Sequence, residues 1–209
     1  MSSISSDKFI EILKTRRSVR EFLPDPIPEA DIEKMIEAAS FAPSGSNLQN
    51  WYFIVITSDT LKKIVFEAVL KQVDENAKNI NSSRARKEYI SYSEYFKFFV
   101  QAPAVIAVVK KPYETLSIRI MKRYNIPFKS NSDIQGVSAA VQNLLLMAHV
   151  LGYGACWMTG PLIAREKIED ILKIDKENEL AAFIPVGKYK KSPAATPRKN
   201  IKEIYSFVR

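Results

Sequence analysis

The arrangement of apolar positions predicts four helical stretches along the chain. Residues 7–15 and 28–43 each place apolar side chains at helical spacing, and the second stretch begins with acidic residues and stops at a proline. Residues 61–99, which are rich in Lys, Glu, Tyr and Phe, are interpreted as one long helix or two shorter ones. Residues 134–150 are apolar nearly all round, which indicates a helix that is buried on several sides.

Four short runs of β-branched, aromatic and other apolar residues predict strands. They cover residues 51–57, 104–109, 153–158 and 180–186. The strands do not alternate strictly with the helices, so an α+β fold with a mixed sheet flanked by helices fits better than a doubly wound parallel one. The chain has 209 residues, 46% of them hydrophobic, and no linker divides it, so residues 1–209 are expected to form a single domain.

Composition narrows the classes of function. The 31 basic residues exceed the 23 acidic ones by 8, which suits anionic small molecules. The basic clusters are dispersed without a recognisable binding module, so they are interpreted as solvated surface and no nucleic-acid partner is expected. The single Cys156 excludes an internal disulfide, and the single His149 excludes a multi-histidine metal site.

Membrane, export and nucleotide-binding patterns are not found in the sequence. No apolar run reaches the roughly 18 residues of a spanning helix, and residues 1–7 have neither the basic nor the apolar region of an export signal. We therefore expect a cytoplasmic protein with no membrane partner. The glycines at 152–160 are spaced wrongly for a dinucleotide fingerprint, and no P-loop sequence occurs.

Two polar motifs carry candidate chemistry. Arg16, Arg17 and Arg20 place three guanidiniums within five residues, and a partly buried guanidinium needs an anion because it keeps its charge, so the run is interpreted as half of a phosphate clamp. The alternative is that these arginines cap a helix and pair with surface acids such as Glu21. Residues 42–51 bring a proline, a glycine, hydroxyls and amides together before a strand, as in a loop that hydrogen-bonds a polar heterocycle.

In this order and spacing, the motifs resemble those of the nitroreductase-like family of FMN flavoproteins. The matching pieces are the basic run at 16–20, the Pro-Ser loop at 43–51, a helix and Gly-rich strand at 133–160, and the Pro-x-Gly and Pro-Arg pairs within 184–198. Residues 62–131 contain no motif that aligns with the family. The resemblance implies a mainly antiparallel sheet, an interlocked dimer and FMN as the cofactor.

The resemblance also implies how FMN is bound. Arg16, Arg20 and Arg198 would hold its phosphate and polyol, while Arg17 and Ser18 would reach the pyrimidine side of its ring. Amides of the Pro-Ser loop would bind the flavin amide edge. Backbone N–H groups of the turn at 157–160 would approach flavin N5 and O4, with the Thr159 hydroxyl as a further N5 donor. The implied cofactor-binding residues are Arg16, Arg17, Ser18, Arg20, Pro43, Ser44, Gly45, Asn47, Gln49, Trp157, Met158, Thr159, Gly160 and Arg198.

Several residues also have ordinary structural interpretations. Pro43 and Gly45 suit a helix stop, and Met158 suits the end of a strand. Cys156 is interpreted as a small buried core residue, and His149 as a helix packing residue with a satisfied ring nitrogen. No residue is expected to act as a nucleophile, because flavin hydride transfer needs none.

By resemblance, the protein is expected to be an NAD(P)H-dependent FMN oxidoreductase. Hydride would pass from NAD(P)H through flavin N5 to an electron-poor acceptor, such as a nitroaromatic or a quinone, in a ping-pong sequence. The alternatives are a reductive dehalogenase, a flavin-remodelling member of the family, or an FMN-binding protein without turnover. Residues 89–99 or 119–128 would roof the pocket. The basic run and the Pro-Ser loop would meet across a homodimer, with residues 201–208 reaching over the partner.

Overall fold

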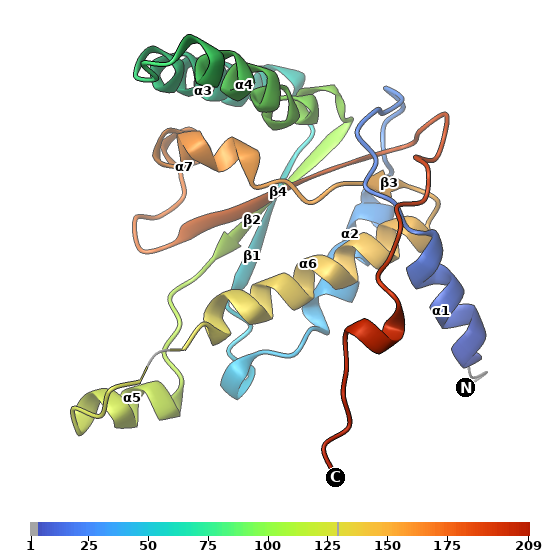
Figure 1. Cartoon of the computed structure of the whole chain (residues 1–209), viewed down its shortest axis with the longest axis vertical. Helices are drawn as coiled ribbons and strands as arrows, with labels where there is room; N and C mark the ends of the chain where they lie inside the picture. The colour runs from blue at the N-terminus through green and yellow to red at the C-terminus, as the bar shows by residue number, and fades with distance from the viewer. Residues whose placement is uncertain (1–3, 129) are drawn as a thin grey trace.

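The fold is a sheet with helices on both faces. The computed structural model describes residues 4–128 and 130–209, so the first three positions of the segment tested for an export signal lie outside the described residues. The helices are α1 (Ser6–Thr15), α2 (Glu29–Ser40), α3 (Asp59–Lys78), α4 (Ser83–Ser93), α5 (Leu116–Arg123), α6 (Ser132–Val150) and α7 (Arg165–Leu172), with 3-10 turns η1 (Gly45–Asn47), η2 (Glu94–Phe96), η3 (Phe98–Gln101), η4 (Gly160–Ala164) and η5 (Ile201–Glu203). Figure 1 shows α3, α4 and α7 on one side of the sheet and α2 and α6 on the other.

The sheet is antiparallel throughout its named strands. It has four strands, β1 (Trp51–Ile56), β2 (Ala104–Lys110), β4 (Glu179–Gly187) and β3 (Gly154–Ala155), in the spatial order β1-β2-β4-β3. Within the described residues, the one parallel pairing is an isolated bridge between Ser18 and Ala155. The α+β fold with a mainly antiparallel sheet is therefore confirmed.

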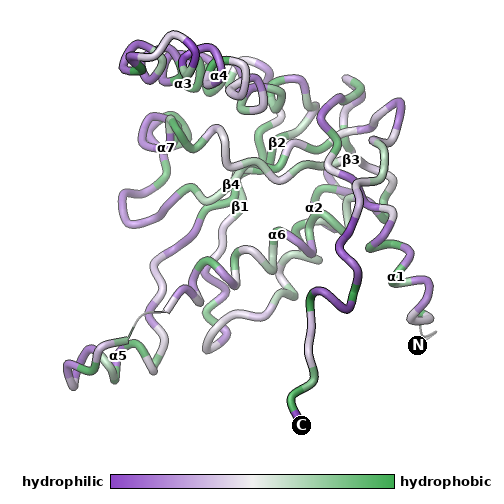
Figure 2. Tube along the Cα trace, in the orientation of Figure 1, coloured by the Kyte–Doolittle hydropathy of each residue, from purple (hydrophilic) through white to green (hydrophobic). Residues whose placement is uncertain are grey.

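The centre of the molecule is β2, which is buried on both faces. Ala104, Ile106 and Val108 pack against the layer of α2 and α6, whereas Val105 and Ala107 pack against the layer of α3 and α7. Because neighbouring residues of a strand point to opposite faces, a strand covered on both sides has to be apolar at every position. Figure 2 shows this as a hydrophobic centre formed by β1, β2 and β4.

The predicted strand at 153–158 is wrong in its length, because β3 covers only Gly154–Ala155. The next residue, Cys156, donates its amide to the Pro185 carbonyl at 3.3 Å. Pro185 has no N–H to return to the ladder, so the pairing stops there. A single bridge between Met158 and Phe183 resumes it further on.

Other differences concern helices. The stretch predicted at 61–99 divides into α3, α4 and two 3-10 turns, and α5 and α7 were not predicted at all. The stretch predicted at 28–43 ends earlier, at Ser40.

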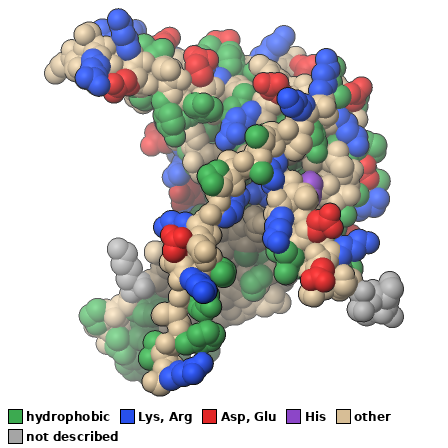
Figure 3. All heavy atoms as spheres, turned by 45° about the vertical axis from the view of Figure 1, so that its right-hand side comes forward, with side chains coloured by type: hydrophobic (Ala, Val, Ile, Leu, Met, Phe, Trp, Pro, Cys, Tyr) green, Lys and Arg blue, Asp and Glu red, His purple; other side chains and the backbone are tan. Residues whose placement is uncertain are grey.

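Two parts of the chain project from the packed body. One is α5 with Tyr124, and the other is the C-terminal segment from η5 onward (Figure 1). Both expose large apolar side chains, among them Ile120 and Tyr124 on the first and Ile204 and Phe207 on the second. Figure 3 shows the lower part of the molecule as rich in hydrophobic side chains.

Candidate functional site

The arginine run follows α1 and is fixed against β3. Ser18 bridges to Ala155, and the Val19 amide donates to the Ala155 carbonyl at 3.1 Å. Val19 is buried beside Gly154, where an added Cβ would come within 2.6 Å of the Val19 side chain. The close approach requires the glycine, and it brings residues 16–20 next to the turn at 157–160.

The predicted arginines are not neutralised by acids. Within the described residues, Arg16, Arg17, Arg20 and Arg198 form no ion pair with a carboxylate, and Glu21 forms none either. Four guanidiniums without carboxylate partners are suited to binding an anion.

Arg17 and Arg198 line one small basic cavity. Arg17 Nη1 donates to the carbonyls of Lys14 at 2.6 Å and Arg16 at 2.8 Å, so it also caps the C-terminal end of α1. Arg198 Nη1 donates to the Thr196 hydroxyl at 2.6 Å. This cavity, which we call the basic cavity, has a volume of about 230 Å³ and is lined by Ile10, Leu13, Lys14, Arg17, Ala195, Thr196 and Arg198. Three cations and no acid line it.

Arg20 lies elsewhere, in a larger aromatic cavity of about 580 Å³. Its guanidinium is 5.9 Å from the centre of the Tyr95 ring and donates a 3.3 Å hydrogen bond to the Ser18 carbonyl. This aromatic cavity is lined by Arg20, Tyr92, Tyr95, Phe96, Phe98, Cys156, Trp157, Met158, Thr159 and Gly160. Arg20 is therefore brought together with all four predicted residues of the turn.

Three of the four backbone amides of the turn, those of Trp157, Thr159 and Gly160, form no hydrogen bond within the described residues. The Met158 amide donates to the Phe183 carbonyl at 2.8 Å, so it belongs to the sheet and is not free for a ligand. The Thr159 side chain is exposed. Gly160 packs so closely on Phe96 that an added Cβ would lie 2.2 Å from its ring.

The Pro-Ser loop has an unusual backbone. Ser46, Asn47 and Gln49 have φ of 53°, 53° and 46°, in the left-handed region that non-glycine residues seldom occupy. The Ser44 hydroxyl accepts from the Gln49 amide at 3.0 Å, and Gln49 Nε2 donates to Asn47 Oδ1 at 3.3 Å. Strained backbone held by local hydrogen bonds is frequent at ligand-binding sites.

This loop does not meet the arginines within one chain. It lines a separate cavity of about 250 Å³ with the start of α6, formed by Pro43, Ser44, Gly45, Ser132, Gln135, Gly136 and Ala139. Most of the predicted site residues thus fall into three groups, at the basic cavity, the aromatic cavity and the loop, whereas Arg16 and Ser18 line none of these cavities.

The structure adds detail to one predicted segment and a residue that sequence reasoning missed. Tyr92, Tyr95 and Phe96 form a wall of the aromatic cavity, so residues 89–99 contribute to this pocket within one chain. Tyr113 places a buried hydroxyl with no hydrogen-bond partner in the described structure beside Gly45, where an added Cβ would lie 1.9 Å away. Only the aromatic spacing could have suggested the first group, and nothing in the sequence suggests the second.

The single cysteine, Cys156, and the single histidine, His149, both have surroundings that are typical of packing residues. Burial raises the pKa of the Cys156 thiol, against the opposing effects of Arg20, Ser18 and Arg16. A 2.9 Å hydrogen bond joins His149 Nε2 to the Thr15 hydroxyl. Both residues fit their interpretation as packing residues.

A comparison with known protein families shows which family the chain belongs to. The family model described as Nitroreductase family matches residues 13–188. The chain belongs to the nitroreductase family. The match runs from the end of α1 through β4 and therefore includes the arginine run, the loop and the turn, whereas Arg198 lies beyond it.

Two relatives of this nitroreductase-family chain are named for two different activities. A putative NAD(P)H nitroreductase of Bacillus subtilis, YfhC, is 24% identical over 204 residues, which cover 94% of this chain and 92% of the relative. An iodotyrosine deiodinase of Danio rerio is 28% identical over 214 residues, which cover 97% of this chain and 68% of the relative.

Two solved structures share the fold of this family member. A BluB-like flavoprotein from Clostridium difficile 630 superposes with a TM-score of 0.90 at 27% identity, covering 99% of this chain and 100% of the other. Oxidized iodotyrosine deiodinase bound to FMN and 3-iodo-L-tyrosine superposes with a TM-score of 0.70 at 23% identity, covering 92% of this chain and 95% of the other.

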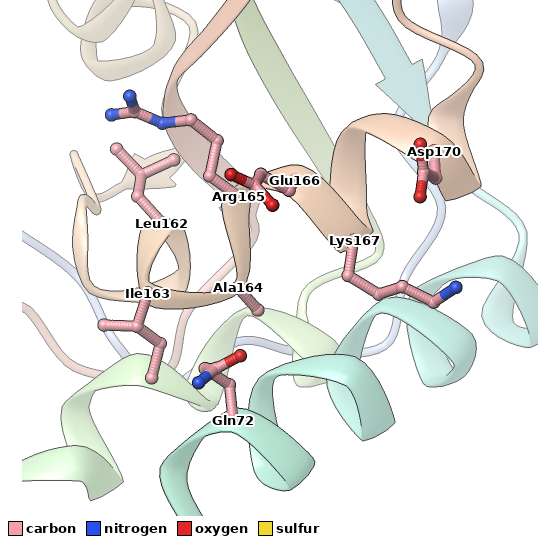
Figure 4. A pocket seen from close by; sticks show the side chains of 8 residues that line it. All are labelled: Gln72, Leu162, Ile163, Ala164, Arg165, Glu166, Lys167 and Asp170. Carbon is pink, nitrogen blue, oxygen red and sulfur yellow. The ribbon is translucent and has the colours of Figure 1, made fainter. Parts of the chain in front are cut away.

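Another cavity of this nitroreductase-family protein contains none of the predicted residues. It measures about 550 Å³ and lies between α3 and the start of α7. Figure 4 shows Gln72 on α3 facing side chains of the segment that runs from η4 into α7.

Neither a spanning helix nor a metal cluster occurs in the described part of the chain. No helix there is long and apolar enough to cross a membrane. No group of three or more His, Cys, Asp or Glu side chains is placed to hold a metal ion in residues 4–128 and 130–209.

Proposed function

We propose that this protein is an FMN-dependent oxidoreductase that takes hydride from NAD(P)H and passes it to an electron-poor small molecule. The observation that carries the proposal is the set of four arginines without carboxylate partners, one of which, Arg20, lines the same cavity as a turn with free backbone donors. The names of the relatives support it, since one is a putative NAD(P)H nitroreductase and one solved relative contains FMN.

Two groups of residues have the chemistry that the two ends of FMN require. Its phosphate needs clustered cations, which Arg17, Arg198 and Lys14 supply in the basic cavity. Its ring edge needs hydrogen-bond donors in a partly closed setting, which the Thr159 and Gly160 amides supply in the aromatic cavity. When bound, FMN supplies a ring that accepts and releases a hydride.

The residues of the chain then have the task of binding and orientation. The Thr159 and Gly160 amides, and the Thr159 hydroxyl, are placed to donate hydrogen bonds to a ring edge that becomes more negative on reduction. No protein nucleophile is needed, in agreement with the structural surroundings of Cys156 and His149.

We also propose a homodimer that shares its active sites. The Pro-Ser loop has the amide chemistry for a flavin edge, but it lines a cavity separate from the arginines. Apolar side chains exposed on α1, such as Phe9 and Leu13, and on the C-terminal segment, such as Ile204 and Phe207, provide surface for a partner. In such a dimer, the loop of one chain would complete the site of the other.

Cofactor identification and turnover test the proposed function. We expect the purified protein to be yellow and to release FMN, not FAD, on denaturation. NADH or NADPH consumption should depend on the bound flavin and on a nitroaromatic or quinone acceptor. Extraction of FAD, or of no flavin after FMN supplementation, would refute the assignment.

Reductive dehalogenation is a second candidate function. It is favoured by the exposed Thr159 hydroxyl in the turn and by the iodotyrosine deiodinase among the relatives. Iodide release from 3-iodotyrosine, driven by a reductant that reduces the bound flavin, tests it. No iodide above that of a protein-free control would remove this candidate.

A further inference from the structure

We propose that Lys110 is a positioning residue for the Pro-Ser loop. It holds Asp133 at the start of α6, and Asp133 in turn holds Asn50, the last residue before β1. The consequence for FMN rests on the proposed function, because it concerns the half of the site that the loop would contribute to a homodimer. None of these three residues is among the predicted cofactor-binding residues.

The sheet sets the position of Lys110. It is the last residue of β2, where the register places it between Trp51 of β1 and Glu179 of β4. Its ammonium group reaches two carboxylates, Asp133 Oδ2 at 2.9 Å and Glu179 Oε2 at 2.8 Å. The Lys110 and Asp133 side chains are 21% and 29% exposed, so water screens this pair less than a fully exposed one. Within the described residues, Asp133 pairs with no other cation.

Asn50 is tied to the same two elements. Its carbonyl accepts from the Lys111 amide of the chain just after β2 at 2.8 Å, and its Nδ2 donates to the main-chain carbonyl of Asp133 at 3.3 Å. Asn50 is 2% exposed, and within the described residues the bond to Asp133 is the one hydrogen bond of its side chain. Leaving a buried amide unpaired is costly, so displacement of Asp133 also displaces Asn50.

The loop before Asn50 depends on support from its surroundings. Ser46, Asn47 and Gln49 have left-handed backbone, which persists only where neighbouring structure holds it. Gly136 of α6 packs on the loop, and an added Cβ there would lie 3.4 Å from the Pro43 carbonyl oxygen. The loop therefore rests on the start of α6, and a shift of α6 at that point moves the amides of Asn47 and Gln49.

Arg165 provides a matched control. It is the first residue of α7, and its Nη1 pairs with Glu179 Oε1 at 2.5 Å, so it shares one carboxylate with Lys110. It does not pair with Asp133. Lys110→Met and Arg165→Met each remove one cation from the same cluster, but only the first leaves Asp133 unpaired. Asp133→Asn removes the pair from the other side, and Lys110→Arg keeps the charge.

Hydrogen–deuterium exchange tests the positioning directly. The amides at 47–49 are hydrogen-bonded within the loop and report its opening. With excess FMN in every sample, we expect these amides to exchange about three- to tenfold faster in Lys110→Met and Asp133→Asn than in the native protein. Arg165→Met should match the native protein, and Lys110→Arg should be closer to it than Lys110→Met is. Native exchange at 47–49 in both Lys110→Met and Asp133→Asn would overturn the inference.

Complementation then assigns Lys110 to one half of the site. Lys110→Met homodimers should bind FMN about three- to tenfold more weakly than the native protein. In a heterodimer with Arg16→Glu, one site has both halves intact and should show the native Kd. In a heterodimer with Asn47→Asp, every site has a damaged loop, so the tighter site should keep the weakened Kd of Lys110→Met. Native affinity in the second heterodimer, or weakened affinity in both, would overturn the inference, because the second result indicates a general loss of stability.

The exchange experiment separates this inference from the proposed function. If the native protein binds no FMN, the proposed function fails, but faster exchange at 47–49 in Lys110→Met still supports the positioning role. If Arg16→Glu and Asn47→Asp do not complement each other, the shared site fails, and the exchange result alone tests the contact between Lys110 and Asp133.

Discussion

At the scale of single residues, arginines that look alike in the sequence have different surroundings. Arg17 donates to two main-chain carbonyls and faces Arg198, whereas Arg20 faces aromatic rings. The sequence predicts that residues 16–20 bind an anion, because three guanidiniums in five residues need partners. It does not predict which way each side chain turns, because this depends on the pairing of Ser18 with Ala155.

Arg198 provides a test of the basic cavity. We expect Arg198→Glu to raise the Kd for FMN at least tenfold, or about 1.4 kcal/mol, because repulsion replaces a charge-assisted hydrogen bond to phosphate. The fold should survive, since the residue is exposed. Lys199→Glu makes the same change of charge at the next exposed position, outside the cavity lining, and should have a much smaller effect. Equal Kd values for Arg198→Glu and the native protein in a fluorescence titration would assign Arg198 to the surface.

Gly45 provides a test of the loop. Its added Cβ would lie 1.9 Å from the Tyr113 hydroxyl, so Gly45→Ala should displace the loop and destabilise the protein by about 1–3 kcal/mol. Tyr113→Phe removes the oxygen that clashes, and the double variant should recover part of the loss. Chemical denaturation of the four proteins measures the coupling. Additive effects of the two substitutions would show that Tyr113 does not restrict the loop.

At the scale of elements, the apolar pattern of the sequence predicts those helices and strands whose positions depend on burial alone. The continuous apolar run of β2 identified a strand buried on both faces, and the all-round apolar character of α6 identified a central helix. The end of β3 was mispredicted because it is decided by the missing N–H of Pro185 on another strand. α7 was missed because one buried residue, Ile168, leaves little apolar signal in a charged stretch.

The contact between α1 and α6 has a pH dependence that can be measured. Burial, and then the charges of Arg16 and Arg17, lower the pKa of His149 below its ordinary value of 6.5. The folded state therefore binds a proton less readily than the unfolded state does. We expect this contribution to the free energy of unfolding to be complete above about pH 6.5 and to decrease as the pH falls toward the folded pKa.

A substitution isolates this contribution. His149→Gln keeps a hydrogen-bonding side chain opposite Thr15 but does not titrate. The loss of unfolding free energy between pH 7 and pH 5.5, measured by urea denaturation, should be smaller in His149→Gln than in the native protein. The same slope in both proteins would mean that His149 does not titrate differently on folding.

At the scale of the whole molecule, the arginine run and the Pro-Ser loop lie apart within one chain, although the proposed function needs them at the same site. Each motif was predicted from its own residue types, but the sequence contains no signal for the distance between them. The structure places the loop against α6 and the arginines beside β3 and α1. The homodimer with shared sites that we propose would bring them together.

Complementation between two damaged chains tests the shared site. Arg16→Glu and Asn47→Asp homodimers should each bind FMN poorly, because every site has one damaged half. A heterodimer would have one site with both lesions and one with none, so it should recover part of the FMN binding and activity. Heterodimers are isolated through different tags on the two chains. If they recover nothing, both motifs serve the same flavin from one chain.

Anaerobic reduction of the purified holoprotein tests the proposed oxidoreductase function most directly. The flavin absorbance near 450 nm is followed while NADH or NADPH is added without oxygen, and a nitroaromatic is added afterwards. We expect the yellow colour to bleach on addition of the nicotinamide and to return on addition of the acceptor, with one acceptor step for each bleaching step. Flavin absorbance that persists with both nicotinamides would contradict the proposed function and indicate a protein that binds FMN without turnover.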